Sequence, residues 1–282
     1  PKLFKNRLKD KILVMLFQKP SLRTRMTFEV GMIGLGGNAI YLGPSEVQLG
    51  IRESAYDVGK NLEQWVDGIM VRTFDHKNII DLAQASRIPV INALSDLLHP
   101  CQGMADFLTL MEKKEDLAHI ISLAYVGDGN NVCHSLLFAA AKTGGKMSIA
   151  TPPGYEPNDE ILKQAKEDGK ETQFNIHLTN DPAEAVDGAD AVYTDTWASM
   201  GQEEEKEKRL KIFSPFQVNA QLMAKAKPNA LFMHCLPAHR GEEVTDEVID
   251  SAQSVVFHQA QNRLHVQKAI MLLLLENKPK NG

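Results

Sequence analysis

The sequence has few cysteines, few aromatic side chains and no long apolar run. Its three cysteines, Cys101, Cys133 and Cys235, are too few and too scattered for a disulfide framework, which indicates a reducing compartment. The longest apolar run, residues 269–275 (AIMLLLL), is shorter than the ~18 residues that a membrane helix needs. We therefore predict a cytoplasmic protein that does not span a membrane.

The sequence also lacks a block of charges of one sign. Its formal net charge is −5 at pH 7, and no run of five or six like charges offers a surface to nucleic acid or to an anionic membrane. The most charged stretch, residues 202–211 (QEEEKEKRLK), is typical of a solvated helix or loop face. We expect no nucleic-acid partner, and any basic site must be local.

Short apolar runs bounded by turn residues recur along the 282 residues, with stretches of helical length between them. This alternation predicts βαβ units, because a parallel strand pair needs a long crossover that a helix usually supplies. The predicted strands are Ile12–Phe17, Ala39–Leu42, Ile69–Val71, Pro89–Ile91, Ile120–Val126, Met147–Ala150, Ala191–Tyr193, Leu231–Met233 and Ser254–Phe257. The fold class is therefore α/β, with two doubly wound parallel-sheet domains.

A charged stretch, residues 112–116 (EKKED), closes one block of these units. We place a domain boundary there, so that residues 1–116 form the first domain and residues 117–258 the second. A final helix, predicted from about Gln259 to Glu276, lies in a segment of residues 259–282 that crosses back to the first domain. A chain of this length is sufficient for two hydrophobic cores.

Residues 18–25 (QKPSLRTR) follow a predicted strand and lead into a helix. Ligands of open α/β sheets collect at the carboxyl ends of strands. The N–H groups of a helix start, two hydroxyls and two guanidinium groups make a site of the kind that phosphate prefers. A helix cap with surface arginines explains this segment alone equally well.

Two further candidates, Arg72 and His99, also stand at or just after predicted apolar runs. Pro100 restricts His99 to an extended or turn conformation, which can fix the imidazole toward a ligand. The useful chemistry of His99 is donation of a hydrogen bond to a polarised carbonyl oxygen, which requires no metal. Taken alone, Arg72 is a surface charge and His99 a structural residue at least as readily.

The segment Gly127–Asn131 (GDGNN) follows the strand predicted at Ile120–Val126 and is similar to a dinucleotide fingerprint. Val132, however, occupies the position of the third glycine in G-x-G-x-x-G, and no acidic residue follows at the expected interval. A nucleotide site is therefore disfavoured. Asn131 can instead offer its amide to a polar ligand.

Two more segments, residues 195–201 (DTWASMG) and 234–237 (HCLP), follow predicted strands directly. Asp195 can hold an amine, and the residues after it can present main-chain and hydroxyl groups to an amino acid, although a loop acid that caps a turn fits as well. The neighbouring pairs Cys133-His134 and His234-Cys235 lack the spacing that lets two side chains reach one metal. We predict no metal site.

Taken together, these segments closely resemble the signature set of the aspartate/ornithine carbamoyltransferase family in order and spacing. S-x-R-T-R at 21–25 and H-P-C-Q at 99–102 are similar to the part that the whole family shares, for carbamoyl phosphate. D-x-x-x-S-M-G at 195–201 and H-C-L-P at 234–237 are similar to the ornithine-specific members. The resemblance runs from about Ile12 to Leu275.

The resemblance implies transfer of the carbamoyl group of carbamoyl phosphate to the side-chain amine of L-ornithine, without a cofactor. The implied carbamoyl phosphate residues are Ser21, Leu22 through its backbone, Arg23, Thr24, Gln48, Arg72, His99, Gln102, Cys235, Leu236 and Arg263. The implied ornithine residues are Asn131, Asp195, Ser199 and Met200. Arg72, His99 and Thr24 would stabilise the oxyanion, and Cys235 would lie beside the reacting amine. The resemblance also implies a homotrimer, or a multiple of one, with active sites at subunit interfaces.

Some residues depart from the pattern. Leu22 replaces the usual threonine, as it does in carbamoyltransferases for N-acetylornithine, and residues 57–61 (DVGKN) differ from the usual D-T-A-R-V. The helix that precedes the first strand in this family is expected to be missing or short. Transfer to N-acetylornithine, putrescine or aspartate therefore stays an alternative, although Ser199–Gly201 favours free ornithine. A nucleotide-dependent oxidoreductase and a non-catalytic carbamoyl phosphate-binding module are the alternatives from other classes.

Overall fold

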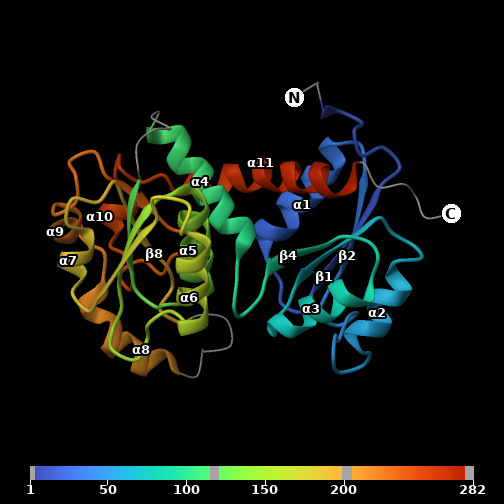
Figure 1. Cartoon of the computed structure of the whole chain (residues 1–282), viewed down its shortest axis with the longest axis horizontal. Helices are drawn as coiled ribbons and strands as arrows, with labels where there is room; N and C mark the ends of the chain where they lie inside the picture. The colour runs from blue at the N-terminus through green and yellow to red at the C-terminus, as the bar shows by residue number, and fades with distance from the viewer. Residues whose placement is uncertain (1–3, 115–120, 199–204, 277–282) are drawn as a thin grey trace. The chain divides into compact units, whose positions relative to one another are not determined.

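The computed structural model describes residues 4–114, 121–198 and 205–276, and it divides into two compact units. Unit 1 comprises residues 1–101 and 263–282, and unit 2 comprises residues 102–262. The division points fall inside helices α4 (Pro100–Lys114) and α11 (Val256–Leu275). The predicted boundary between residues 116 and 117 lies outside the described residues. Each unit contains its own parallel sheet, which confirms the predicted α/β class (Figure 1).

The sheet of unit 1 has four parallel strands in the order β2-β1-β3-β4. Its elements are β1 (Ile12–Phe17), α1 (Leu22–Gly34), β2 (Asn38–Leu42), α2 (Ala55–Leu62), β3 (Gly68–Arg72), α3 (His76–Ala85) and β4 (Val90–Leu94). Alternate residues of β1 point to opposite faces of the sheet. Met15 packs with α1 and the end of α11, whereas Leu16 packs with α2 and α3. Because both faces are covered, β1 reads as one continuous apolar run.

The strand order of unit 1 places a topological switch between β1 and β3. The chain goes from β1 to β2 on one side and then returns to β3 on the other side. Phe17, the last residue of β1, lies beside Arg72, the last residue of β3. Open α/β sheets bind ligands outside the carboxyl ends of the strands at such a switch. The segment at 18–25 and Arg72 therefore meet where the fold favours a site.

The sheet of unit 2 has five parallel strands in the order β7-β6-β5-β8-β9. Its elements are β5 (Ser122–Val126), α5 (Asn131–Thr143), β6 (Lys146–Ala150), α6 (Asp159–Asp168), β7 (Asn175–Thr179), α7 (Pro182–Val186), β8 (Ala191–Thr194), α8 (Lys206–Phe213), the 3₁₀ helix η3 (Ser214–Phe216), α9 (Ala220–Met223), β9 (Leu231–Met233) and α10 (Asp246–Ile249). The switch lies between β5 and β8, so residues 127–131 and Asp195 occupy neighbouring strand ends.

The sequence prediction was wrong at one strand and missed another. Ser254–Phe257 is not a strand: Ser254 forms only an isolated bridge with Phe232, and α11 begins at Val256, three residues before the predicted helix start. A short apolar run fits a buried strand and a helix start equally well. The missed strand, β7 (NIHLT), lies at the sheet edge with partly exposed residues, and it lacks the apolar run that marked the others.

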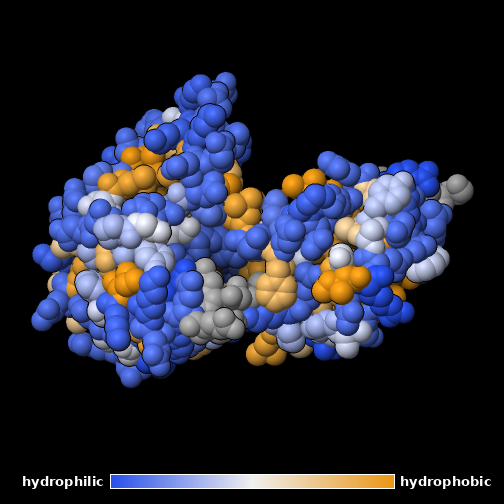
Figure 2. Space-filling model, turned by 90° about the horizontal axis from the view of Figure 1, so that it is seen from below, coloured by the Kyte–Doolittle hydropathy of each residue, from blue (hydrophilic) through white to orange (hydrophobic). Residues whose placement is uncertain are grey.

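The face that Figure 2 shows is mainly hydrophilic, with hydrophobic residues gathered in separate patches. Several large apolar side chains are nevertheless exposed in unit 1, among them Ile51 (83%), Leu22 (76%) and Trp65 (68%). Among the helices of the described residues, none combines the length and the hydropathy required for a membrane span.

Candidate active site

The site residues of unit 1 start at the N-terminus of α1. Ser21 is the N-cap residue, and its Oγ accepts a hydrogen bond from the Thr24 backbone N–H at 3.4 Å. The Ser21 hydroxyl also lies 3.2 Å from Thr24 Oγ1, and Arg263 Nη2 donates to that Thr24 oxygen at 3.3 Å. Thr24 and Arg263 are buried. The free N–H groups and the positive end of the helix dipole thus coincide with a buried guanidinium, an arrangement suited to an anion.

His99 lies within the electrostatic field of three arginines. Burial lowers the pKa of His99 well below its usual value, and the positive charges of Arg263, Arg72 and Arg23 lower this pKa further. These residues come from four separate segments of unit 1, and the fold brings them close together. The imidazole is consequently neutral near pH 7, and a neutral imidazole can donate one hydrogen bond.

The chemistry of this cluster follows from its charges. Arginines and a helix N-terminus favour a phosphate group, and arginine can bind it through two parallel hydrogen bonds. A neutral histidine beside them can donate to a carbonyl oxygen and stabilise negative charge that develops there. The cluster therefore suits a ligand that carries both a phosphate and a carbonyl group.

Gln18, which the sequence reasoning did not single out as a site residue, connects three segments near this cluster. Its Nε2 donates to the Leu49 carbonyl at 2.9 Å, and its Oε1 accepts from the Thr73 hydroxyl and from the Phe74 N–H. Gln18 thereby fixes the ends of β1 and β3 and the loop after β2. Its place directly after a predicted strand was the only available signal in the sequence.

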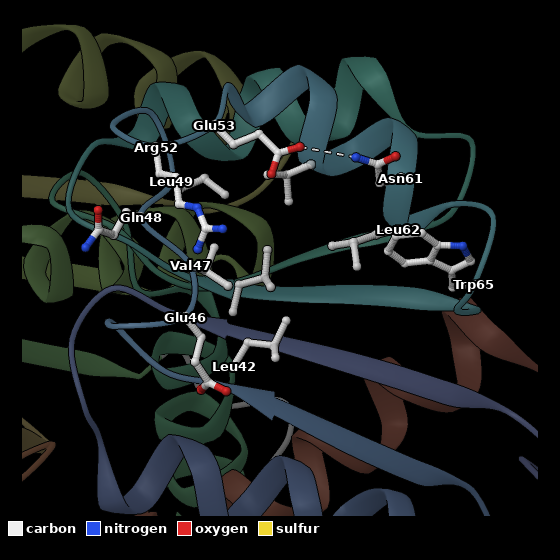
Figure 3. A pocket seen from close by; sticks show the side chains of 12 residues that line it. Leu42, Glu46, Val47, Gln48, Leu49, Arg52, Glu53, Asn61, Leu62 and Trp65 are labelled. Atoms are coloured by element: carbon white, nitrogen blue, oxygen red, sulfur yellow. Dashed lines mark hydrogen bonds between the residues drawn. The ribbon is translucent and has the colours of Figure 1, made fainter.

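Gln48 and Leu22 have different surroundings from the other predicted residues of unit 1. Gln48 lies on the loop after β2 and lines a pocket of 240 Å³ with Leu49, Arg52 and Trp65 (Figure 3). Neither the described hydrogen bonds nor the charges near His99 join Gln48 to the arginine cluster. The Leu22 side chain is exposed in the first turn of α1, and because it is apolar, only the backbone N–H of Leu22 can donate to a phosphate there.

Gln102 belongs to unit 2, where a buried carboxylate holds it. Its Nε2 donates to Asp106 Oδ1 at 2.8 Å, and the Gln259 side chain donates to the same oxygen at 2.8 Å. The Tyr193 hydroxyl donates to Asp106 Oδ2 at 3.0 Å. Asp106 is fully buried, and it connects α4, α11 and β8. This network fixes the rotamer of the predicted ligand residue Gln102.

The centre of the predicted ornithine site is Asp195, which is only 6% exposed. Its Oδ1 accepts from Cys235 Sγ at 3.1 Å, and its Oδ2 accepts from Asn130 Nδ2 at 2.8 Å. Asn130 also caps α5, since its side chain accepts from the N–H groups of Val132 and Cys133. The structure thus joins Asp195 to Cys235, two residues of the predicted site. Asn131 is the first residue of α5, and its neighbour Asn130 makes the contact with Asp195.

A buried ion pair anchors the loop after Asp195. Arg209 Nη1 donates to Asp128 Oδ2 at 3.0 Å and to the Trp197 carbonyl at 2.8 Å. Burial raises the pKa of Asp128 to about 6, while the Arg209 charge and its hydrogen bond act in the opposite direction. Arg209 therefore fixes Trp197 to the segment after β5. Ser199 and Met200, which follow Trp197, lie outside the described residues.

The glycines at 127 and 129 have a packing explanation. Gly127 has a φ of +139°, a backbone conformation that residues with a side chain rarely adopt. A Cβ on Gly129 would lie 2.3 Å from the Pro157 nitrogen, and the Gly129 N–H donates to the Tyr155 carbonyl. The two glycines thus allow a tight turn against the chain at 155–157, which accounts for them without a dinucleotide.

Asp195, His234 and Cys235 bring one possible metal-ligand atom each within 4.8 Å of one another, a grouping that residue spacing did not predict. Cys235, however, donates its thiol proton to Asp195. The two ring nitrogens of His234 are engaged by the Leu236 N–H and by Glu243. A metal ion at this place would therefore have to displace these hydrogen bonds, and it would require the Cys235 thiol to lose its proton.

Comparison with known proteins covers both units. The family described as "Aspartate/ornithine carbamoyltransferase, carbamoyl-P binding domain" matches residues 2–112, and its Asp/Orn binding domain matches residues 120–274. The chain is 54% identical to the ornithine carbamoyltransferase of Thermococcus kodakarensis, over 95% of this chain and 85% of that protein. It is 53% identical to the anabolic ornithine carbamoyltransferase of Pyrococcus furiosus, over the same shares of the two chains.

Solved structures give the same result. The ornithine carbamoyltransferase of Pyrococcus furiosus matches with a TM-score of 0.94 and 52% identity, covering 98% of this chain and 88% of that chain. The enzyme of Thermus thermophilus matches with a TM-score of 0.86 and 48% identity, covering 97% of this chain and 90% of that chain.

Proposed function

This chain belongs to the aspartate/ornithine carbamoyltransferase family, and we propose that it transfers the carbamoyl group of carbamoyl phosphate to L-ornithine. The products are L-citrulline and phosphate. The observation that carries the proposal is the arginine cluster around a neutral His99, which suits a ligand with a phosphate and a carbonyl group. The anabolic relative of Pyrococcus furiosus supports citrulline synthesis, for arginine biosynthesis, as the direction of the reaction.

Carbamoyl phosphate binds through two kinds of group. Its phosphate accepts hydrogen bonds from the start of α1, where Ser21, Leu22, Arg23 and Thr24 present hydroxyl, backbone and guanidinium donors. Arg72 contacts phosphate and carbonyl together, and His99 donates to the carbonyl oxygen. Arg263, through its bond to Thr24, adds the remaining positive charge. Gln102, fixed by Asp106, engages the carbamoyl amide.

Ornithine binds in unit 2. Asp195 holds the amino acid through its buried carboxylate, and Asn131, Ser199 and Met200 bind the rest of the substrate. Cys235 and the Leu236 carbonyl lie beside the reacting side-chain amine. Arg209 supports this arrangement because it fixes Trp197, two residues before Ser199.

The reaction starts when the neutral side-chain amine attacks the carbamoyl carbon. A C–N bond forms, and negative charge develops on the carbonyl oxygen, where Arg72, His99 and Thr24 stabilise it. The C–O bond to phosphate then breaks, phosphate leaves with the electron pair, and the departing phosphate accepts the proton that the new amide nitrogen loses. Holding both substrates in line lowers the entropic cost of this step. The step requires no cofactor.

A substrate comparison tests this proposal. We expect citrulline formation from carbamoyl phosphate and L-ornithine at a kcat/KM at least about 100-fold above that for putrescine, N-acetylornithine or L-aspartate at equal concentrations. The measurement is steady-state product formation at pH 8 with each acceptor. A preference for another amine would leave the proposed carbamoyl phosphate-binding residues unchanged and would contradict the proposed ornithine-binding residues. Binding of carbamoyl phosphate without any turnover would identify a non-catalytic module.

We place the enzyme in a reducing compartment, the cytoplasm, because none of its three cysteines forms a disulfide. We also propose a homotrimer in which Gln48 completes the carbamoyl phosphate site of a neighbouring subunit. The exposed Ile51 and Trp65 on and near the Gln48 loop support a contact surface there, since large exposed apolar side chains mark interfaces.

Mixing two defective variants tests the shared site. In a trimer with shared sites, Gln48→Ala and His99→Ala subunits together rebuild intact sites. Random reassembly at equal amounts should restore about a quarter of wild-type activity, because one subunit interface in four then joins an intact Gln48 to an intact His99. Light scattering of the wild type should give three times the chain mass. No recovery in proven mixed trimers would place Gln48 in its own subunit's site.

A further inference from the structure

A fully buried glutamate contacts His234, the residue directly before Cys235. Glu243 is 0% exposed, and its Oε1 accepts a hydrogen bond from the His239 backbone N–H at 2.5 Å. The same oxygen lies 3.2 Å from His234 Nε2, and His234 is also 0% exposed. Two buried groups that can carry charge, one of them adjacent to a predicted catalytic cysteine, therefore contact each other in unit 2.

The tautomer of His234 follows from its backbone contact. His234 Nδ1 lies 2.9 Å from the Leu236 N–H, which can only donate, so Nδ1 must be the acceptor. The ring proton is consequently on Nε2, and it points to the Glu243 carboxylate. Glu243 stabilises this tautomer because a carboxylate only accepts hydrogen bonds.

The tautomer matters because Leu236 adopts an unusual backbone conformation. Leu236 has a φ of +59°, which non-glycine residues rarely adopt and which surrounding contacts must maintain. The bond from its N–H to His234 Nδ1 is such a contact. The His234 backbone N–H is fixed in addition by Gln259 Oε1 at 3.0 Å. This short segment therefore determines where the Cys235 thiol and the Leu236 carbonyl point.

The backbone around Glu243 is fixed to the core of unit 2. The Val218 N–H donates to the Glu243 carbonyl at 2.9 Å, and the Gln217 side chain donates to the carbonyls of Gly241 and Glu242. Val244, the next residue, is fully buried in the hydrophobic core. The Glu243 carboxylate is thus held in place by the backbone on both sides of it.

We propose that Glu243 is a positioning residue for carbamoyl transfer. It selects the Nε2–H tautomer of His234, and His234 then holds Leu236 in the conformation that presents Cys235 and the Leu236 carbonyl to ornithine. Glu243 acts through His234 and touches no substrate. The inference rests on the proposed function for its kinetic consequence, but the tautomer itself is independent of any activity.

The kinetic test compares neighbouring glutamates. Glu243→Ala should lower kcat about 10- to 100-fold, because the groups that orient a site residue typically have effects of this size. Its Kd for inorganic phosphate should stay within about twofold of wild type, since the phosphate donors lie in unit 1. Glu243→Gln retains an oxygen that accepts from Nε2–H and should restore activity to within about threefold of wild type. Glu242→Ala is the matched control, because the Glu242 carboxylate pairs with Lys206 and not with His234; it should leave kcat unchanged.

The spectroscopic test needs no turnover. In ¹⁵N-histidine-labelled wild-type protein, two-bond ¹H–¹⁵N spectra should show His234 as the neutral Nε2–H tautomer, and Glu243→Ala should populate both tautomers. His234 protonated at Nδ1 in the wild type would overturn the proposal, as would equal kcat values for Glu243→Ala and Glu242→Ala. If Glu243→Ala does not fold, two other measurements test the proposal: the tautomer of His234 in the wild type, expected to be Nε2–H, and the kcat of Glu243→Gln, expected within about threefold of wild type. An inactive wild type with the Nε2–H tautomer would reject the proposed function and the kinetic role of Glu243 with it, while retaining the contact by which Glu243 stabilises the His234 tautomer.

Discussion

His99→Ala is expected to lower kcat about 100- to 1,000-fold, the usual effect of removing one preorganised hydrogen-bond donor from a developing oxyanion. His99 is buried, and burial together with Arg263, Arg72 and Arg23 keeps it neutral. The neutral imidazole therefore acts as a donor to the carbonyl oxygen and not as a cation that holds phosphate. The Kd for phosphate should consequently change little, which isothermal titration calorimetry can measure.

Two controls separate this role from a structural one. His76→Ala removes a half-buried histidine of the same unit, whose Nδ1 contacts the Ser95 hydroxyl, and it should leave kcat unchanged. The pH profile gives the second control. The side-chain amine of ornithine has a pKa near that of lysine, ~10.4, so kcat/KM for ornithine should rise from pH 6 to 9. Because the pKa of His99 is lowered, His99→Ala should keep this slope. A slope that disappears in the variant would assign the titration to His99.

Asp195→Asn should reduce kcat/KM for ornithine by about 30- to 4,000-fold, which corresponds to about 2–5 kcal/mol for removing one partner of a buried charge pair. The carboxylate is 6% exposed, and the Cys235 thiol and Asn130 amide already orient it. The variant keeps the shape of the side chain and removes its charge. The measurement is initial rate against ornithine concentration at saturating carbamoyl phosphate.

The matched control is Asp187→Asn, an exposed aspartate at the C-terminus of α7 in the same unit. It should change neither kcat nor KM, because a surface carboxylate without a substrate contributes little. In Asp195→Asn the Kd for phosphate should remain that of the wild type. A variant that loses phosphate affinity and keeps its ornithine KM would assign Asp195 to the other substrate.

Much of the fold could be predicted from local patterns. The apolar run Ile12–Phe17 is a central parallel strand because both of its faces are buried, and Ser21 caps α1 because its hydroxyl satisfies a free N–H. The prediction failed where these signals are weak. The edge strand β7 is too polar to be recognised, and the apolar residues at 254–257 begin a helix.

Only part of the site could be predicted in the same way. The motif residues Thr24, Arg72, His99 and Arg263 were identified from their resemblance to a family, and the structure brings them together. The residues that orient the site carry no local signal. Asp128 and Arg209, for example, are 81 positions apart and form a buried ion pair, so their partnership depends on a contact between distant segments.

The sequence by itself determined the α/β class, most strands of the two sheets and the family, because these depend on residue periodicity and short motifs, but it missed β7. The tertiary structure alone decided which strand ends meet at the two switch points, and hence that Arg72 lies beside the end of β1 and that Asn130 reaches Asp195. It also decided the charge states of buried groups such as His99, since desolvation and the fields of distant arginines depend on three-dimensional packing.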